Sequence, residues 1–392
     1  MPDGREAITV RVAGSLAEVD AAGWDACAGT ESPFIRHAFL SALEDSGSAT
    51  AETGWAAQHL VIEDEAGGYL AVAPMYLKNH SYGEYVFDWG WAEAYERAGG
   101  RYYPKLICAV PFTPAQGPRL MVRPGTSTDQ TEHLQATLAS AMVQVAERMK
   151  VSSVHINFPN EAEWKLMGDV GYLQRQGQQF HWENQGYETF DDFLTQLSSR
   201  KRKNIKKERA RVKEMPLDIQ ALRGAEITEA HWDAFYGFYC NTTDRKWGES
   251  YLTREFFSLI GERCGDDVVL IYGVAESTPV CGALNLVGSD TLYGRNWGSA
   301  ANFKFLHFEV CYYRAIDFAI EHGLSRVEAG AQGPHKIQRG YLPSPTYSAH
   351  WIADPGLRDA IARFLDDERQ GIEHEMTINT RHSPFRQDND AN

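Results

Sequence analysis

Residues 328–351 read EAGAQGPHKIQRGYLPSPTYSAHW. Gly330, Gly333 and Pro334 predict that a strand ends here and that the following loop can approach a ligand closely. The stretch also carries two histidines, a lysine and an arginine, which are more ionisable side chains than a buried core segment usually contains. We therefore predict an active site around this strand end, and its candidate catalytic residues are Glu328, His335, Lys336 and Arg339.

The same order of elements occurs twice along the chain, at a spacing of roughly 170–210 residues. Each half reads as a hairpin, a long amphipathic helix and a short buried strand. In the first half these elements lie at residues 59–77, 129–149 and 151–158. In the second half they lie at residues 268–287, 304–322 and 326–330, with a further strand at 291–297. Asp129 followed by Glu132 predicts a capping box at the first long helix. The repeat predicts an α/β protein with two lobes of the same kind and mixed sheets.

The composition is that of a globular protein, with 43% hydrophobic and 23% charged residues among 392. A chain of this length favours two domains. The net charge is −15, from 38 basic and 53 acidic residues. This charge opposes nucleic-acid binding by the whole surface, although a local basic patch could still bind an anionic partner.

Six cysteines are scattered along the chain without a CxxC motif, which predicts neither a zinc site nor a disulfide framework. Reduced thiols indicate a cytoplasmic protein. The N-terminus lacks an apolar signal core, and no run of 18 apolar residues predicts a transmembrane helix. The motifs GxSxG, Walker A, GxGxxG and HExxH are missing. His307-Phe308-Glu309 matches the HxE of zinc deaminases, but its PCxxC partner is missing, so we predict no metal.

A strongly basic helix is predicted between the two halves. Residues 200–213 contain nine basic residues and one acid, Glu208, beside a narrow apolar stripe. A solvated linker helix would explain this pattern, but positive charge gathered in an acidic chain favours an anionic partner. The predicted domains are residues 1–190, a linking helix 191–216, residues 217–382 with the site, and a disordered tail 383–392. The candidate tRNA- or anion-binding residues are Arg200, Lys201, Arg202, Lys203, Lys206, Lys207 and Arg209.

Further polar residues cluster in the second half and are predicted to meet at one edge of its sheet, where strand ends hold ligands. A helix N-terminus there would attract negative charge and could help to stabilise an oxyanion. Each member also has a structural explanation, since tryptophans can fill a core, arginines can form ion pairs and glycines can mark a bulge. The candidate substrate-binding residues are Arg245, Trp247, Tyr293, Arg295, Trp297, Lys304, His307, Glu309, Gln332, Tyr341 and His350.

Several blocks of the chain resemble the FemAB-like family labelled "peptidoglycan biosynthesis/recognition". They are SSRKRKNIKKERARV (198–212), RKWGESYLTREFF (245–257), GALNLVGSDTLYGRNWG (282–298), FLHFEVCYYRAIDFAIEHGL (305–324) and residues 328–351, with YYPKLICAVPFTPAQGPRL (102–120) in the first half. The resemblance extends from about residue 8 to residue 382.

This resemblance implies two tandem GNAT-like lobes joined by the basic helix, and transfer of an aminoacyl group from its tRNA ester to an amine. It also implies that His335-Lys336 replaces the phenylalanine-lysine element that steadies the oxyanion in Fem enzymes. GNAT enzymes that use acyl-CoA hold pyrophosphate with a Q/R-x-x-G-x-G/A loop, which residues 297–305 lack. Aminoacyl-tRNA is therefore the favoured co-substrate, with no other cofactor, and acyl-CoA is less favoured.

Three functions remain open from the sequence. The first is an aminoacyl-tRNA-dependent acyltransferase that acts on a small metabolite or a cell-wall precursor. The second is an acyl-CoA-dependent N-acyltransferase, and the third is a non-catalytic binding protein on the same fold. In the first two, Glu328 or His335 would accept a proton from the attacking amine, and Lys336 or Arg339 would stabilise the oxyanion.

Overall fold

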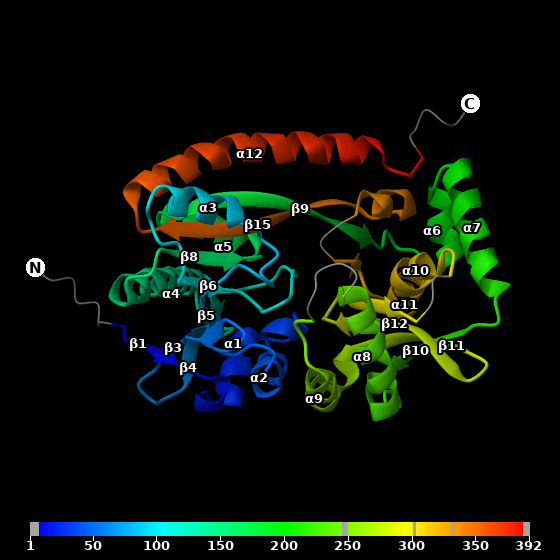
Figure 1. Cartoon of the computed structure of the whole chain (residues 1–392), viewed down its shortest axis with the longest axis horizontal. Coiled ribbons are helices and arrows are strands. Elements are labelled where there is room, and N and C mark those ends of the chain that lie inside the picture. Colours follow the sequence, from blue (N-terminus) through cyan, green and yellow to red (C-terminus); the bar gives the residue numbers. More distant parts are fainter. Residues whose placement is uncertain (1–7, 245–249, 301–302, 331–332, 387–392) are drawn as a thin grey trace, which may run out of the picture. The chain divides into compact units, whose positions relative to one another are not determined.

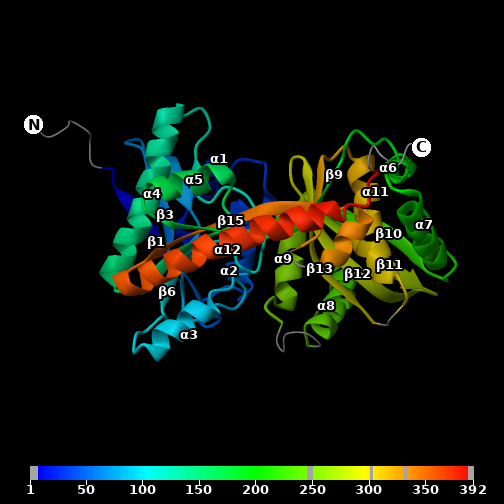
Figure 2. The same cartoon turned by 90° about the horizontal axis from the view of Figure 1, so that it is seen from above.

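The computed structural model describes residues 8–244, 250–300, 303–330 and 333–386 (Figures 1 and 2). The chain divides into two compact units. The first unit comprises residues 1–177 and 346–371, and the second comprises residues 178–345 and 372–392. These boundaries differ from the expected ones because residues 346–371 return to the first unit.

The described strands of the first unit form a four-stranded antiparallel sheet and a second, mixed sheet. The four-stranded sheet has the order β1 (Val10–Ala13), β3 (His59–Glu63), β4 (Tyr69–Ala73) and β7 (Met121–Val122). The mixed sheet has the order β2 (Trp55–Ala57), β5 (Met75–Lys78), β6 (Lys105–Cys108), β8 (Ser153–Asn157) and β15 (Leu342–Ile352). The helices are α1 (Ala21–Ala28), α2 (His37–Asp45), α3 (Trp89–Arg97), α4 (Thr128–Met149), α5 (Glu161–Asp169) and the first part of α12 (Pro355–Arg381).

The second unit contains one mixed sheet in its described part. The strand order is β10 (Asp218–Arg223), β11 (Val268–Ala275), β12 (Thr278–Val287), β13 (Thr291–Ser299), β14 (Arg326–Glu328) and β9 (Leu173–Glu183). The helices are α6 (Phe190–Gln196), α7 (Ser199–Lys213), α8 (Glu229–Asp244), α9 (Arg254–Cys264), α10 (Leu306–Phe308) and α11 (Arg314–Glu321). A π-helical turn, η5 (Glu309–Tyr313), joins α10 to α11, and a 3-10 segment, η6 (Pro334–Arg339), follows β14. Figures 1 and 2 show α6 beside α11.

Both units are built around the same motif. In the first unit β6 and β8 are parallel and α4 lies between them in the chain, while β15 pairs antiparallel with β8. In the second unit β13 and β14 are parallel and the segment α10–η5–α11 lies between them, while β9 pairs antiparallel with β14. A parallel pair requires such a crossover, and a helix supplies it. The predicted fold class and repeat are confirmed.

The apolar faces of the crossover helices form the cores. Leu134, Leu138 and Met142 of α4 are buried in the first unit. Ile316 and Ala319 of α11 are buried in the second unit. Each helix therefore has one face packed on its own unit, as the helical spacing predicts.

Several predicted elements differ in detail. Helix α4 begins at Thr128, and its cap is Ser127, whose side chain accepts a hydrogen bond from the Gln130 amide, so the predicted capping box at Asp129 is wrong. Residues 69–77 form two strands of different sheets, interrupted at Pro74, because proline cannot donate a ladder hydrogen bond.

The end of the chain also differs from its prediction. Residues 342–352 were expected as a loop but form β15, and α12 follows. The predicted disordered tail begins with ordered residues, since the Ser198 amide donates to the Pro384 carbonyl and Phe385 packs near Phe193. Residues 387–392 of that tail lie outside the described residues. No described helix combines the length and apolar character that a bilayer crossing requires.

Candidate functional site

The two parallel strands of the second unit separate at the predicted site. Their pairing ends at Tyr293 and Glu328, where β14 stops, while β13 continues to Ser299. A β-bulge beside this point makes Arg295 an extra residue in β13. Bulges bend a strand and redirect its side chains. The end of β14 therefore places Glu328 at a strand terminus of the kind that holds ligands in mixed α/β sheets.

Glu328 is a buried carboxyl group, with only 5% of its surface exposed. It pairs across the sheet with His181 of β9, and its Oε1 lies 3.8 Å from His181 Nε2. Burial raises the pKa of Glu328 to about 8, and Arg326 opposes the shift. A carboxyl with this pKa can exchange a proton near neutral pH, as a general base must.

His181 is a site residue that sequence reasoning missed. It is buried, and burial together with Arg326 and Lys336 lowers its pKa to about 3, so the ring is neutral. Its Nε2 lies 3.3 Å from Gln179 Oε1. Its Nδ1 is buried without a hydrogen-bond partner among the described residues. No motif marks residues 173–183 as a strand, and only that assignment would have brought His181 to Glu328.

Lys336 lies in η6 and is almost fully buried, at 2% exposure. Its Nζ donates a hydrogen bond to the Gly330 carbonyl at 2.8 Å. Burial lowers the pKa of Lys336 to about 7. Gly330 and Gly333 have φ of 77° and 122°, conformations that favour glycine, and they follow the end of β14 at Glu328, as predicted. A buried amine of this pKa is a candidate for electrostatic or proton-transfer work.

His335 belongs to an aromatic group beside Lys336. Its Nε2 lies 2.9 Å from the Tyr312 hydroxyl, and its ring contacts His307 with centroids 6.2 Å apart. His307 in turn contacts Trp297 edge to face at 5.4 Å. The structure therefore brings three predicted residues, Trp297, His307 and His335, into one group. Tyr312, which lies on the π-helical turn, is a further member that the sequence did not single out.

The cationic helix is joined to the segment that carries Lys336. Glu208 of α7 binds Arg339 of η6, with both carboxylate oxygens 3.0 Å from Arg339 Nη2, and it also accepts a hydrogen bond from the Tyr313 hydroxyl. The Arg339 guanidinium lies 3.4 Å from the centroid of the Phe308 ring. Arg339 is thus engaged on both sides. We assign it a positioning role, in place of the predicted catalytic one.

Three other predicted site residues have internal partners. Glu309 is buried and lies 3.2 Å from Arg209 and 3.3 Å from Arg314. Arg209 also binds Asp317. Arg209 is therefore an ion-pair residue of the core rather than a free anion-binding residue. Tyr341 is fully buried and donates to the Tyr312 carbonyl at 3.2 Å, which is a structural role.

His350 lies in the first unit, unlike the other predicted site residues. It is buried on β15, where its Nδ1 lies 2.7 Å from His155 Nδ1, and Trp91 contacts its ring. The prediction failed because residues 342–352 form a strand of the other unit. Lys304 is exposed just before α10. Arg245, Trp247 and Gln332 lie outside the described residues.

Helix α7 is part of the second unit, packed by buried Ile205 and Val212, and is not the separate linker that was expected. The predicted basic residues other than Arg209 are exposed or half-buried. Lys206 pairs with Asp191 at 3.0 Å. Within the described part of the chain, Arg200, Lys203 and Lys207 are exposed and form no ion pair. These three side chains remain available to an anionic partner.

Each unit thus has a parallel strand pair with a helical crossover and an antiparallel neighbouring strand, and the second unit places buried ionisable groups beside its strand end. A family model described as FemAB-like, peptidoglycan biosynthesis/recognition, matches residues 15–387, and the chain belongs to this family. The structure of FemX is similar at 12% identity, covering 89% of this chain and 98% of that chain with a TM-score of 0.54. L-PGS from Bacillus licheniformis is similar at 10% identity, covering 83% of this chain and 96% of that chain with a TM-score of 0.50. At these identities the likeness shows the fold alone. No curated protein sequence matches the chain.

Proposed function

We propose that the protein transfers an aminoacyl group from aminoacyl-tRNA to an amine or hydroxyl acceptor. One observation carries the proposal: the Glu208–Arg339 ion pair joins the cationic helix α7 to the η6 segment that holds Lys336. This ion pair joins the surface proposed to bind phosphate to the segment that carries the proposed oxyanion-stabilising lysine. Membership of the FemAB-like family, whose resemblance implies an aminoacyl donor, supports the proposal.

The reaction needs no covalent enzyme intermediate, because an aminoacyl ester is already activated. The acceptor nitrogen or oxygen attacks the ester carbonyl, and Glu328 takes the proton that the nucleophile loses. Protonated Lys336 stabilises the oxyanion of the tetrahedral intermediate. When the bond to the ribose oxygen breaks, Glu328 returns the proton to that leaving oxygen. His181 lies next to Glu328, with its Nε2 3.8 Å from Glu328 Oε1.

Helix α7 gives the first prediction, which concerns donor binding. Replacing Arg200, Lys203 and Lys207 together with glutamate is expected to weaken the binding of aminoacyl-tRNA by at least tenfold at low salt. Each lost phosphate contact removes roughly 0.7–0.9 from the slope of log K against log salt concentration. Filter binding of bulk aminoacyl-tRNA over a salt series measures both quantities.

The control carries the same change of charge at exposed positions of the first unit: Arg148→Glu, Lys165→Glu and Arg363→Glu. It separates a local contact from the effect of net charge, and should bind tRNA nearly as the unmodified protein does. Binding that is absent, insensitive to salt, or equally weakened by both triple variants would refute the tRNA proposal. Stabilisation by CoA or an acyl-CoA in a thermal shift would instead favour the acyl-CoA donor.

The second prediction concerns pH. The reaction needs ionised Glu328, with a pKa of about 8, and protonated Lys336, with a pKa of about 7. The value of kcat/KM should therefore rise below about pH 7, peak near pH 7.5 and fall above about pH 8. In Glu328→Gln the rise below pH 7 should disappear, because the glutamine has no proton to lose. A pH–rate profile of this variant that keeps the rising limb would assign the proton transfer to another group.

A further inference from the structure

Residues 81–89 of the first unit reverse the usual placement of polar and aromatic side chains. The polar side chains of this loop are buried, each with at most 4% of its surface exposed: Ser81, Glu84 and Asp88. The aromatic side chains of the same loop have 37–55% of their surface exposed: Tyr82, Tyr85, Phe87 and Trp89. Apolar surface shown to water in this density marks an interaction site.

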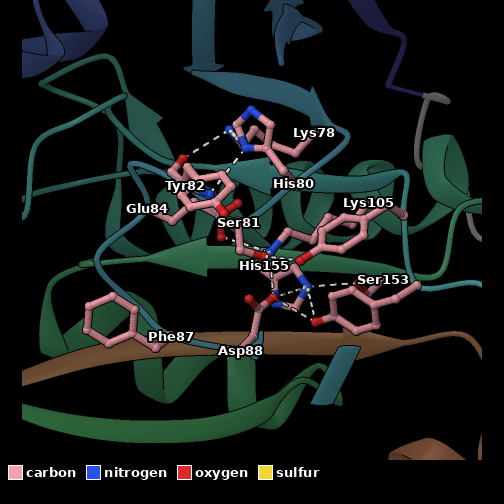
Figure 3. A network of polar contacts seen from close by, with 12 residues as sticks. Lys78, His80, Ser81, Tyr82, Glu84, Phe87, Asp88, Lys105, Ser153 and His155 are labelled. Carbon is pink, nitrogen blue, oxygen red and sulfur yellow. Dashed lines mark hydrogen bonds and ion pairs between the residues drawn. The ribbon is translucent and has the colours of Figure 1, made fainter. Parts of the chain in front are cut away.

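A buried lysine holds the loop from beneath. Lys105 Nζ donates to Ser81 Oγ and to Glu84 Oε2, both at 2.8 Å, and to Asp88 Oδ2. The Tyr102 hydroxyl donates to the same Asp88 oxygen at 2.7 Å. Figure 3 shows these polar groups gathered together, with the ring of Phe87 apart from them. The side chains that would normally face water are thus fixed inside.

The backbone of the loop is held as well. Lys78 Nζ donates to the Tyr82 carbonyl at 3.2 Å, and an Arg175 guanidinium nitrogen donates to the Phe87 carbonyl at 2.7 Å. Tyr85 has a φ of 59°, which an aromatic residue adopts only where its surroundings hold it there. Contacts of this number make the loop rigid, so its aromatic side chains are presented in a fixed arrangement.

Three of the exposed rings contact one another in a row that the half-buried His80 extends, and we call this row the aromatic patch: His80, Tyr82, Phe87 and Trp89. The centroids of Tyr82 and Trp89 lie 5.6 Å apart, as do those of Phe87 and Trp89. His80 extends the row, at 5.2 Å from Tyr82. The patch therefore offers flat ring faces beside imidazole, phenol and indole hydrogen-bonding groups.

Charge indicates which partner fits the aromatic patch. Residues 78–105 contain four basic and four acidic residues, so this region is neutral in a chain of net charge −15. A neutral surface gives a polyphosphate or an anionic membrane no electrostatic attraction. Beneath the patch, Glu84 Oε1 and Asp88 Oδ1 accept no hydrogen bond from any described residue.

We propose that the aromatic patch is a carbohydrate-binding site. A pyranose with equatorial hydroxyls has a flat face of C–H groups, which stacks on an aromatic ring, and an edge of hydroxyl donors and acceptors. A β-linked oligosaccharide repeats this face along its length and matches a row of rings. The site lies in the first unit and rests on contacts of that unit alone, so it does not depend on the proposed acyl transfer.

The test uses the full chain with cellotetraose and chitotetraose as probes. Isothermal titration calorimetry, which needs no tryptophan signal, should give saturable binding of at least one of the two sugars, and stacking on the exposed Trp89 should also change the tryptophan fluorescence of the unmodified protein. Trp89→Ala and Phe87→Ala should each weaken this binding by at least tenfold. Val170→Ala, which truncates an apolar side chain of 40% exposure elsewhere in the first unit, should bind as the unmodified protein does.

Circular dichroism melting curves establish that the variants are folded, as expected for substitutions of exposed side chains. The proposal would be overturned if neither sugar showed saturable binding up to its solubility limit, or if Trp89→Ala bound the sugar as tightly as the unmodified protein does. Two further measurements identify other occupants. Sedimentation of the protein with phosphatidylcholine vesicles, if lost in Trp89→Ala, would make the patch a membrane contact instead. Concentration-dependent dimerisation, if lost in the same variant, would make it an interface between two copies of this chain.

Discussion

Lys336→Met is expected to lower kcat for aminoacyl transfer by about 10²–10³-fold while leaving donor binding nearly unchanged. The loss of one oxyanion-stabilising donor from a preorganised site has an effect of this size. Lys336 is suited to the role because it is 2% exposed and is held by the Gly330 carbonyl at 2.8 Å. Methionine keeps the length and volume of the side chain but has no donor, so the variant isolates the chemistry from the packing. Single-turnover rates with prebound aminoacyl-tRNA measure the effect.

The stability of the same variant distinguishes a catalytic lysine from a structural one. The pKa of Lys336 is lowered from its ordinary value to about 7, so burial of its charge opposes folding. A lowered pKa means that the stability contribution present above about pH 10 is lost as the pH falls towards 7. Lys336→Met has no such loss, so it should be at least as stable as the unmodified protein, and its advantage should grow as the pH falls.

The pH profile gives a second readout. In Lys336→Met the residual activity should rise until about pH 8 and then stay level, because the group whose deprotonation causes the decline is absent. The exposed Lys165→Met serves as the control and should match the unmodified protein in rate, profile and stability. Lys336 would have no catalytic role if Lys336→Met kept the rate of aminoacyl transfer, or if its lower rate were explained entirely by unfolding.

Local patterns predicted the repeat but not that residues 346–352 of β15 belong to the first unit. Helical spacing in α4 and α11 and the apolar strands between them are short-range signals, and they gave the correct lobes. Strand β15 follows the second unit in the chain yet pairs with β8 of the first, from Ser348 to Ile352. Such long-range pairing leaves no local signal. It explains why His350 was assigned to the wrong unit.

The sequence identified residues of the candidate site where charged and histidine side chains are close together in the chain, and missed the one that stands apart from them. Glu328, His335 and Lys336 lie in one conspicuous stretch. His181 lies in QQFHWE, where nothing but cross-strand pairing with Glu328 gives it a role. In the basic helix, charge alone could not distinguish Arg209, which binds Asp317 and Glu309 inside the unit, from Lys203, which is exposed. That distinction depends on which face of the helix packs.

The largest stability effect is expected from Lys105→Met in the first unit. Lys105 is fully buried and is the cation between Glu84 and Asp88. Its removal leaves two carboxylates buried without compensation, which costs about 3–5 kcal/mol. For a unit of this size the thermal transition should fall by roughly 6–20 °C. Differential scanning calorimetry measures it, with the exposed Lys165→Met as a control that should not shift.

The pH dependence of this loss has a definite sign. Burial raises the pKa of Glu84 to about 7 even with Lys105 present. Burial acts in the same direction on Asp88, but Lys105 outweighs it and holds the pKa of Asp88 below its usual range. Without Lys105 both carboxyl groups would bind protons more tightly in the folded state than in the unfolded state. A raised folded pKa gives stability that is lost as the pH rises, so the deficit should be small near pH 5 and largest near pH 8. A deficit that does not depend on pH would indicate lost packing instead.

Combining Lys105→Met with Glu84→Gln and Asp88→Asn should restore most of the stability, because replacing every member of a buried ion network by neutral groups leaves no uncompensated charge. Restoration would mean that the charges are not needed for the fold of the first unit. What they do hold is the loop that carries the aromatic patch, since Lys105 binds that loop at Ser81, Glu84 and Asp88. The triple variant should therefore be stable and still bind the tetrasaccharides several-fold more weakly. If it bound them as the unmodified protein does, the ion network would not be what arranges the patch.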